Sequence, residues 1–346
     1  MRGDEEMFDT YLKQVVNGEH LSSEEAYCAA NMLLHDDISE IKAAAFLAAL
    51  RTRRENENEL LGFIQALQEQ SIKMECDREL FDTCGTGGDG YRTFNISTAV
   101  AIVLAACGVP VAKHGNRGAS GPVGSSDVLE ALGVRVELKP DEAQRLLDRT
   151  GFTFLFAPHY HPVLRKMSPV RKGLGIPTLF NFLGPLLNPY QLSYQLLGVS
   201  DKKIQETMAQ TLKGLGRKHA LVVRGDNGMD EISPLGPTLA YEVRYDDITC
   251  YRIDPEEIGM PLIALKHIQG RDAATNAAMI LQVLKGEPGP CREVVLLNTG
   301  YALVLAGKAA DAREGVALAA ETIDCGRALN TLRNLVSYSR DGILAC

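Results

Sequence analysis

Apolar residues in the first part of the chain recur at the three- and four-residue spacing of amphipathic helices. Clear examples are the stripe that runs from Phe8 to Val15 and the stripe that runs from Leu60 to Leu67. Ser22 followed by Glu25 fits a capping box, which marks the start of another helix. We therefore predict four helices in residues 1–72, forming a small helical domain for docking or dimerisation.

After a charged linker at residues 71–77, short apolar runs alternate with helical segments. The runs that predict strands are Leu80–Thr83, Val109–Ala112, Val134–Leu138, Phe152–Phe156, Tyr194–Val199 and Ala220–Val223, followed by a polar hairpin over Thr238–Tyr245 and Ile248–Ile253. The helices expected between them are Thr98–Ala106, Ser125–Leu132, Asp141–Arg149 and Lys202–Leu212, and residues 271–339 form a helical tail. This alternation predicts an α/β protein with a mainly parallel central sheet.

The predicted domains are a small all-helical one at residues 1–72 and a large α/β one at residues 78–346, with a helical C-terminal part. Part of residues 160–190 is a candidate addition to the small domain. The chain has 346 residues, of which 45% are hydrophobic, so it can bury the cores of two domains.

Composition narrows the class of protein. No apolar run approaches the roughly 18 residues of a membrane span, and the acidic N-terminus has no signal-peptide pattern. The eight cysteines are scattered without a CxxC pair, which is typical of reduced cysteines in a cytosolic protein. A net charge of −8 opposes general nucleic-acid binding. We expect a cytoplasmic protein that binds neither membrane nor nucleic acid.

The main candidate for chemistry is a glycine-rich loop at residues 85–90, which follows a predicted strand. Exposed backbone N–H groups in such a loop form a nest for phosphate oxygens, although a plain glycine turn is the alternative. The loop satisfies GxGxxG, yet five residues separate it from the next helix, and the following strand ends in the basic pair Lys113-His114. Both features oppose a dinucleotide-binding turn, and no Walker A lysine follows.

Two further segments suit anions. Asn95-Ile96-Ser97-Thr98 opens an apolar helix, where Asn95 or Ser97 can cap the helix and a hydroxyl can also ligate magnesium held by phosphates. The stretch from Lys113 to Gly121 is basic and glycine-rich and follows a strand, which favours phosphate binding over a merely solvated face. Ser125 opens another helix and gives a second possible anion site.

The remaining candidates are an arginine, a pair of acids and two histidines. Arg171 lies in a window from Arg149 to Ser200 that contains no Asp or Glu, and a guanidinium can hold a carboxylate bidentately. Asp230-Glu231 follow a strand in a glycine turn and suit magnesium, unless they are solvated turn residues. For His159 and His161 we favour packing over metal binding.

Seven motifs occur together in the chain: GTGGDG (85–90), NIST (95–98), KHGNR (113–117), SSDVLEALG (125–133), PVRKGLG (169–175), FNFLGPLLNP (180–189) and GMDE (228–231). In this order they resemble the anthranilate phosphoribosyltransferases of the nucleoside phosphorylase/phosphoribosyltransferase family. The resemblance implies a helical domain hinged to the α/β domain, assembled as a homodimer. It also implies transfer of a phosphoribosyl group from 5-phosphoribosyl 1-pyrophosphate to the amine of anthranilate, releasing pyrophosphate, in tryptophan biosynthesis.

The resemblance further implies which residues bind each ligand. Those for phosphoribosyl pyrophosphate are Gly85, Gly88, Asp89, Thr93, Asn95, Ile96, Ser97, Thr98, Lys113, His114, Gly115, Asn116, Arg117, Gly118, Ala119, Ser120, Gly121 and Ser125. Those for anthranilate are Gly85, Asn116 and Arg171, with Arg171 facing the carboxylate. Two magnesium ions are expected at Ser97, Asp230 and Glu231, bound with the pyrophosphate.

No covalent nucleophile is expected. Lys113, His114, Asn116 and Arg171 are expected to act by electrostatics and positioning. One departure from the family pattern stands at Pro122-Val123, where many relatives carry a Lys-Ser pair, so this loop lacks a charge and a hydroxyl.

Two other functions deserve a test. A nucleoside phosphorylase of the same fold would use inorganic phosphate and would not need the acid pair Asp230-Glu231, which disfavours it. A non-catalytic relative that binds nucleic acid would have a strongly basic surface, which the net charge of −8 opposes.

Overall fold

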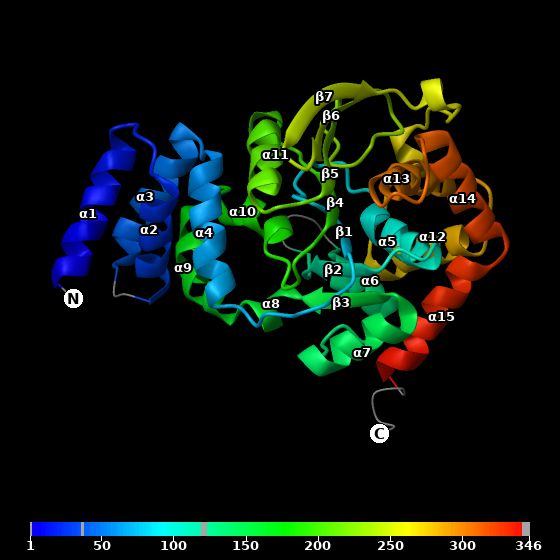
Figure 1. Ribbon diagram of the computed structural model, residues 1–346, viewed down its shortest axis with the longest axis horizontal. Coiled ribbons are helices and arrows are strands. Elements are labelled where there is room, and N and C mark those ends of the chain that lie inside the picture. Colours follow the sequence, from blue (N-terminus) through cyan, green and yellow to red (C-terminus); the bar gives the residue numbers. More distant parts are fainter. Residues whose placement is uncertain (1, 36–37, 119–122, 341–346) are drawn as a thin grey trace.

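The computed structural model describes residues 2–35, 38–118 and 123–340. Within them, the N-terminal part forms the predicted helices α1 (Arg2–Val16), α2 (Ser23–His35), α3 (Glu40–Arg53) and α4 (Glu57–Glu69), which pack side by side (Figure 1). The expected capping box is present, because Ser22 N donates to Glu25 Oε2 (2.8 Å) and Glu25 N donates to Ser22 Oγ (3.2 Å).

One central sheet contains every strand in the described residues. The strands are β1 (Phe81–Gly85), β2 (Val111–Gly115), β3 (Phe152–Phe156), β4 (Tyr194–Gly198), β5 (His219–Gly225), β6 (Thr238–Arg244) and β7 (Asp247–Ile253). Their order is β3-β2-β1-β4-β5-β6-β7. Strands β1 to β5 are parallel, whereas β6 and β7 are antiparallel, which confirms the mainly parallel sheet and the polar hairpin.

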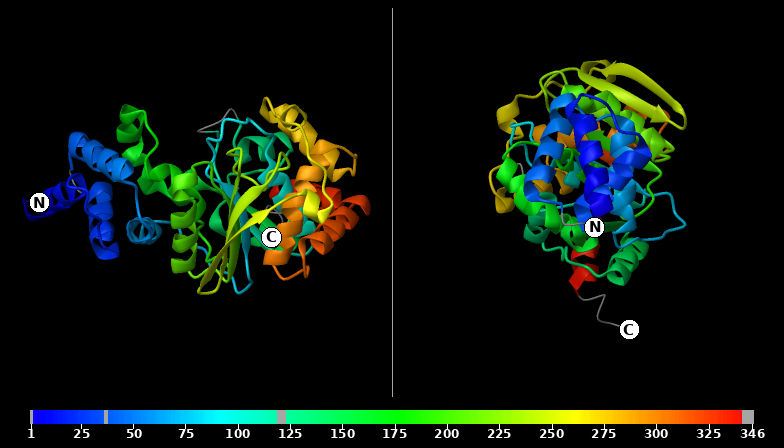
Figure 2. Two further views of the ribbon diagram at one scale, coloured as in Figure 1. Left: turned by 90° about the horizontal axis from the view of Figure 1, so that it is seen from above. Right: turned by 90° about the vertical axis from the view of Figure 1, so that its left-hand side faces the viewer.

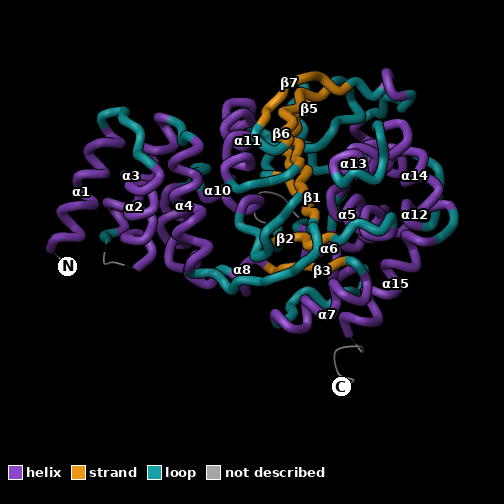
Figure 3. The backbone as a smooth tube through the Cα atoms, viewed as in Figure 1, coloured by secondary structure: helices purple, strands orange, loops and turns teal. Residues whose placement is uncertain are grey.

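Helices lie on both sides of the sheet (Figures 1 and 3). On one side are α5 (Ile96–Ala106), α12 (Ala273–Leu284), α13 (Pro290–Leu305), α14 (Ala312–Asp324) and α15 (Arg327–Arg340). On the side of the N-terminal helices lies α11 (Gln205–Gly214), while α6 (Ser125–Ala131) and α7 (Pro140–Thr150) connect β2 to β3. Short helices α8 (Ala157–Tyr160), α9 (Ser168–Leu174) and α10 (Phe180–Leu183) precede β4. The view from above separates the N-terminal helices from the sheet and its C-terminal helices (Figure 2).

The apolar side chains form two cores. The first lies between the sheet and the group of α5 and α12 to α15. The second joins α1 to α4 with residues 167–187, α11 and the other face of β4 and β5. Phe63 of α4, for example, meets Phe180 of α10 edge-on, with 6.2 Å between the ring centroids. Residues 167–187 therefore pack with the N-terminal helices, while the domain boundaries given above stay a prediction.

The predicted strand at Val134–Leu138 is wrong. Val134, Val136 and Leu138 are buried and alternate with exposed residues, but the segment pairs with no strand. Its backbone is satisfied elsewhere, since Arg135 N donates to Ser339 Oγ (3.0 Å) and Val134 N donates to Leu129 O (2.9 Å). Alternation of apolar and polar residues indicates that every second side chain is buried. This extended segment buries those side chains without pairing its backbone in a sheet.

The strand order creates a switch point beside β1. The chain runs from β1 outward to β2 and β3, and then returns to place β4 on the other side of β1. The loops after β1 and β4 therefore leave the sheet in opposite directions, which opens a crevice at the carboxyl ends of these strands.

Candidate active site

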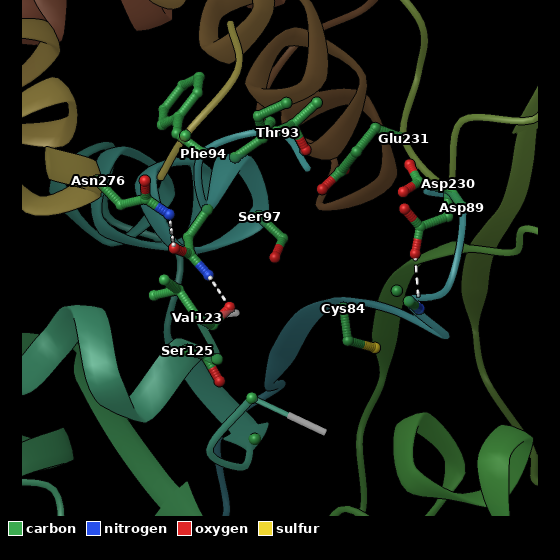
Figure 4. Close-up of a pocket in the computed structure, with 18 of the residues that line it drawn as sticks. Cys84, Asp89, Thr93, Phe94, Ser97, Val123, Ser125, Asp230, Glu231 and Asn276 are labelled. Carbon is green, nitrogen blue, oxygen red and sulfur yellow. Dashed lines mark hydrogen bonds between the residues drawn. The ribbon is translucent and has the colours of Figure 1, made fainter. Parts of the chain in front are cut away.

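A cavity of about 1050 Å³ occupies this crevice (Figure 4). The predicted site residues that line it are Gly85, Gly88, Asp89, Thr93, Asn95, Ile96, Ser97, Lys113, His114, Gly115, Asn116, Arg117, Gly118, Ser125, Asp230 and Glu231. Thr98 is fully buried and Arg171 lies elsewhere, so neither belongs to the lining. Ala119, Ser120 and Gly121, and Pro122 of the noted departure, lie outside the described residues.

The glycine loop after β1 is shaped by left-handed backbone conformations. Gly87, Gly88 and Gly90 have φ values of 68°, 80° and 78°, which side chains other than glycine rarely adopt. Gly87 N donates to Asp230 Oδ2 (2.7 Å), and Ser200 Oγ donates to Gly87 O (2.8 Å). The loop is thus held by the segments after β4 and β5.

Two other glycines allow the acid pair to approach the sheet. A Cβ added to Gly198 would lie 1.6 Å from Asp230 O, and one added to Gly85 would lie 2.5 Å from Asp230 Oδ2. Both distances are shorter than any real contact of a Cβ atom. Gly198 is therefore required for the backbone of Asp230 to sit at the end of β4, and Gly85 leaves room for the Asp230 carboxylate at the end of β1.

Three carboxylates gather on one side of the cavity, namely those of Asp89, Asp230 and Glu231 (Figure 4). Desolvation, followed by the charge of Asp89, raises the pKa of Asp230 well above its ordinary value. Desolvation and the charge of Asp230 raise the pKa of Glu231 in the same direction. Asp89 Oδ2 is buried without a hydrogen-bond partner among the described residues.

This arrangement fits a divalent cation. Oxygen ligands close together, with too little positive charge nearby, are what magnesium prefers when phosphates supply the remaining ligands. Ser97, which also lines the cavity, offers a hydroxyl as a further oxygen ligand. No group of three or more His, Cys, Asp or Glu side chains in the described part of the chain forms a metal site by itself. The residues therefore suit a cation that arrives with a phosphorylated ligand.

Lys113 of β2 lines the same cavity and is almost fully buried. Its Nζ donates to Thr83 O and to Ser97 Oγ, the latter at 3.3 Å. Asp82 on the adjacent strand β1 is fully buried and accepts a hydrogen bond from Asn188 Nδ2 (3.0 Å). Burial raises the pKa of Asp82 to about 6, against the opposing charge of Lys113.

We expect Asp82→Asn to change how stability depends on pH. A carboxyl whose folded pKa is about 6 and whose ordinary value is 3.8 stabilises the fold fully only below pH 3.8. The wild-type free energy of unfolding should therefore fall between pH 4 and 6, relative to the variant, by at most about 3 kcal/mol. Urea denaturation of both proteins across this range measures the difference, and a constant difference would contradict the assignment.

His114 follows Lys113 and is held in one tautomer. Its Nδ1 lies 3.0 Å from Gly184 O, and because a carbonyl only accepts, Nδ1 carries the proton. Burial lowers the pKa of His114 to about 3, with His161 beside it at 5.2 Å between ring centroids. His114 Nε2 is thus a neutral acceptor, and it has no partner in the described structure. His161 itself donates to Leu187 O (2.7 Å), in line with the packing role favoured from the sequence.

The basic loop after β2 is held by acids that follow it. Arg117 forms a bidentate pair with Glu130, at 2.7 and 3.0 Å, and also approaches Asp127 and Glu137. Asp127 Oδ2 accepts hydrogen bonds from Gly118 N (2.9 Å) and Gly124 N (2.8 Å). Arg117 therefore lines the cavity while its guanidinium is already paired with carboxylates. The small residues around Arg117 in the sequence gave no sign of this pairing.

Asn95 stands at the N-cap position of α5 but does not cap the helix. Its amide instead connects two other segments, since Nδ2 donates to Val123 O (3.3 Å) and Oδ1 accepts from Asn276 Nδ2 (2.9 Å; Figure 4). Ser97 lies inside α5 and is not the cap either. The predicted capping role is thus wrong, because the side chain makes tertiary contacts in preference to local ones.

A further wall of the cavity comes from residues that the sequence analysis missed. Gly270, Arg271 and Asn276, close to the start of α12, line the cavity together with Arg92 from the loop before α5. These residues lie almost 180 positions apart, and only tertiary packing brings them together. No local motif marked the segment before α12 as part of a site.

Arg171 lies on α9, which packs against α3. Its guanidinium carbon is 5.6 Å from the centroid of the Phe180 ring, and burial lowers the pKa of Arg171 below its ordinary value. Arg171 therefore packs against the second core through Phe180 and outside the cavity lining, and its predicted contact with a carboxylate stays a prediction.

A helical domain, a mostly parallel sheet and an anion-binding cavity at a switch point define an α/β protein that binds a phosphorylated small molecule. Two sequence models of the glycosyl transferase family match the chain, one for the helical bundle domain over residues 9–71 and one for the a/b domain over residues 77–329. The chain belongs to this glycosyl transferase family.

Individual relatives agree in length and fold. Anthranilate phosphoribosyltransferase from Syntrophomonas wolfei is 59% identical over 340 residues, which cover 98% of this chain and all of that protein. Anthranilate phosphoribosyltransferase from Thermus thermophilus has a crystal structure with a TM-score of 0.90 and 40% identity, covering 95% of this chain and 99% of that one.

The enzyme of the same name from Saccharomyces cerevisiae has been solved with ligands. Its structure with PRPP and Mg has a TM-score of 0.89 and 28% identity, and its structure with 4-fluoroanthranilate has a TM-score of 0.87 and 27% identity. Each alignment covers 97% of this chain and 98% of that one.

Proposed function

We propose that this protein is a pentosyltransferase that moves the phosphoribosyl group of 5-phosphoribosyl 1-pyrophosphate onto the amine of anthranilate, in tryptophan biosynthesis. The observation that carries the proposal is the set of carboxylates at Asp89, Asp230 and Glu231 facing a glycine-rich nest in one cavity. A nucleoside phosphorylase would not need these acids. The full-length similarity to anthranilate phosphoribosyltransferases supports the choice of both substrates.

The donor occupies the cavity between the glycine loop and the basic loop. The backbone of residues 88–90 and the N-terminal end of α5 face its phosphates, and Lys113 adds a positive charge near Ser97. Ser97, Asp230 and Glu231 would hold Mg²⁺, two ions by analogy with the family, and the cation would supply positive charge to neutralise the leaving pyrophosphate. The PRPP and Mg bound to the yeast enzyme support this reading.

The reaction is a substitution at the anomeric carbon of ribose. The bond from this carbon to the pyrophosphate oxygen breaks, a bond to the anthranilate nitrogen forms with inversion, and the nitrogen then loses a proton to the released pyrophosphate or to solvent. An aromatic amine is neutral at pH 7, so no strong base is required. The chain contributes position and charge: its N–H groups hold the phosphates, and the neutral Nε2 of His114 accepts a hydrogen bond from the amine.

The acceptor lies between the cavity and the N-terminal helices, near Gly85 and Asn116. Arg171 holds its carboxylate through two parallel hydrogen bonds. Because Arg171 does not line the cavity, this contact requires α9 to approach the cavity edge when both substrates are bound. Burial raises the pKa of the Cys84 thiol and so disfavours its thiolate, and we assign Cys84 no nucleophilic role.

Arg171→Ala should raise the KM for anthranilate about a hundredfold, because a bidentate charged pair contributes about 3 kcal/mol, while the KM for the donor changes little. Initial rates over a grid of both substrates measure the two constants. Arg165→Ala, in the same acid-free window, is the matched control and should leave both unchanged. Equal effects of Arg171→Ala on the two KM values would remove its assigned role.

The decisive test of the function is the loss of anthranilate fluorescence, followed with and without the donor and Mg²⁺. Loss should require both. Turnover of a nucleoside with inorganic phosphate in the absence of a divalent cation would favour the phosphorylase, and a gel shift with single-stranded DNA tests the non-catalytic alternative.

We also propose a cytoplasmic homodimer that associates through the helical domain. Exposed apolar side chains on this domain support it, namely Met7 and Val16 on α1 and Ile41 on α3, of which Ile41 is 83% exposed. Among the described residues, no helix is long and apolar enough to span a membrane. Sedimentation of the wild type and of Ile41→Glu would test the dimer.

A further inference from the structure

Two cysteines lie where α5, α14 and α15 pack against one another, away from the donor cavity. Cys107 is the residue at which α5 ends, and Cys325 is the residue at which α14 ends. Cys107 is half-buried, whereas Cys325 is exposed. The proposed transfer reaction uses neither thiol, so this pair needs its own explanation.

A single threonine on α14 contacts both thiols. Cys107 Sγ donates to Thr322 Oγ1 (3.3 Å), although 215 positions separate the two residues in the sequence. Cys325 Sγ lies 3.5 Å from Thr322 O. Thr322 is fully buried at this point of contact between the helices. The fold therefore brings a half-buried thiol and an exposed thiol next to one residue.

Arg327, the first residue of α15, distinguishes the two thiols. Its Nε donates to Cys325 Sγ (3.1 Å), and its other end approaches Glu321 Oε1 (3.4 Å). The hydrogen bond from Arg327 lowers the pKa of Cys325, although the charge of Glu321 opposes it. Burial raises the pKa of Cys107, against its hydrogen bond with Thr322 and the charge of Arg327. Cys325 is therefore the thiol that ionises more readily and is open to solvent, which are the two properties of a reactive cysteine.

We propose that Cys325 and Cys107 form a redox pair, in which a hydroperoxide oxidises Cys325 and Cys107 then closes a disulfide with it. The inference rests on the contacts of these side chains and not on the proposed function. In a reducing compartment a disulfide of this kind is transient, and it is typical of redox sensing.

The chemistry takes two steps. The Cys325 thiolate attacks one oxygen of the peroxide, so that a sulfur–oxygen bond forms, the oxygen–oxygen bond breaks and hydroxide leaves. The sulfur of Cys325 thereby gives an electron pair to the peroxide and becomes a sulfenic acid. The Cys107 sulfur then attacks this sulfur, the sulfur–oxygen bond breaks, and the departing hydroxide takes the thiol proton of Cys107 to leave as water. A dithiol reductant restores both thiols by disulfide exchange.

The backbone at both cysteines suits such a link. Gly108 and Gly326 follow the two cysteines directly and have φ values of 84° and 81°, so each helix ends in a left-handed glycine turn. The ends of helices fray and adjust more readily than their interiors. The disulfide would fasten the end of α5, whose first turn lines the donor cavity, to the turn between α14 and α15.

The test is mass spectrometry of the full chain. The reduced protein is treated briefly with hydrogen peroxide, and the remaining thiols are blocked with N-ethylmaleimide. Trypsin releases Cys107 within residues 93–113 and Cys325 within residues 314–327, and neither peptide contains another cysteine. The wild type should yield these two peptides joined, and dithiothreitol should separate them. Recovery of both peptides only in the blocked form, or with Cys325 oxidised but not joined to Cys107, would overturn the proposal.

Variants test the order of the steps. In Cys107→Ser the sulfenic acid of Cys325 should accumulate and react with dimedone, whereas in Cys325→Ser the Cys107 thiol should stay reduced. Arg327→Gln should form the disulfide at least about twofold more slowly, because it lacks the cation that stabilises the thiolate. Cys250→Ser is the matched control, since Cys250 is also exposed but lies on β7, and it should form the disulfide like the wild type. Oxidation of Cys107 in Cys325→Ser, or an unchanged rate in Arg327→Gln, would refute the assigned roles.

Discussion

The double variant Asp230→Asn plus Glu231→Gln should lose magnesium-dependent turnover, with kcat/KM reduced about a thousandfold or more. The change keeps the shape of both side chains and removes the two charges that would hold the cation. A bound cation contributes several kcal/mol of charge stabilisation to such a reaction, and each 1.36 kcal/mol is a factor of ten. Initial rates across a range of Mg²⁺ concentrations measure the effect.

The fold of this variant should survive, because desolvation already disfavours the charged forms of both carboxylates. Its melting temperature should equal or exceed that of the wild type at pH 8. Asp226→Asn is the matched control, since Asp226 lies in the same turn, pairs with Arg252 and does not line the cavity. Wild-type turnover in the double variant would refute the magnesium site.

Gly198→Ala should be the most damaging single substitution. Its Cβ would lie 1.6 Å from the carbonyl oxygen of Asp230, and backbone must move to relieve the overlap. We expect a loss of about 3 kcal/mol of stability, together with displacement of the acid pair and loss of most turnover. Chemical denaturation and initial rates at saturating Mg²⁺ measure the two effects separately.

The control for this substitution is Gly173→Ala on α9. A Cβ at Gly173 has no atom within 4 Å, so the variant should match the wild type or gain up to about 1 kcal/mol from its better helix propensity. Wild-type stability in Gly198→Ala would mean that the loop carrying Asp230 is not packed against β4 as described.

Much of the fold follows from local patterns in the sequence. The helices of the N-terminal part, the parallel order of strands and the polar hairpin each have a periodicity or a turn that depends on nearby residues only. The segment at Val134–Leu138 shows the limit, since its alternation specifies which side chains are buried but not what the backbone pairs with. Partners in a sheet are a tertiary property.

Site residues could be predicted where a single short segment carries all the side chains or backbone groups that bind the ligand. The glycine loop and the acid pair Asp230-Glu231 carry their ligand preference in adjacent residues, and both line the cavity. The wall formed by Arg92 and Arg271 was not predictable, because each arginine alone looks like an ordinary surface residue. The pairing of Arg117 with Glu130 escaped notice for the same reason, since thirteen positions separate two residues that the fold brings into contact.

The second core has a consequence for how this protein could change its acceptor. Residues 167–187 pack with the N-terminal helices, and Arg171 rests on Phe180 of that core, whereas the donor cavity belongs to the strand ends and the helices on the opposite face. If Arg171 holds the acceptor as proposed, the carboxylate of the acceptor is recognised by a part of the chain that packs separately from the donor cavity, while Gly85 and Asn116 serve the side that both substrates share. Substitutions around α9 and α10 can then select a new aromatic amine while donor recognition is inherited intact, so evolution or design can exchange one half of the reaction at a time.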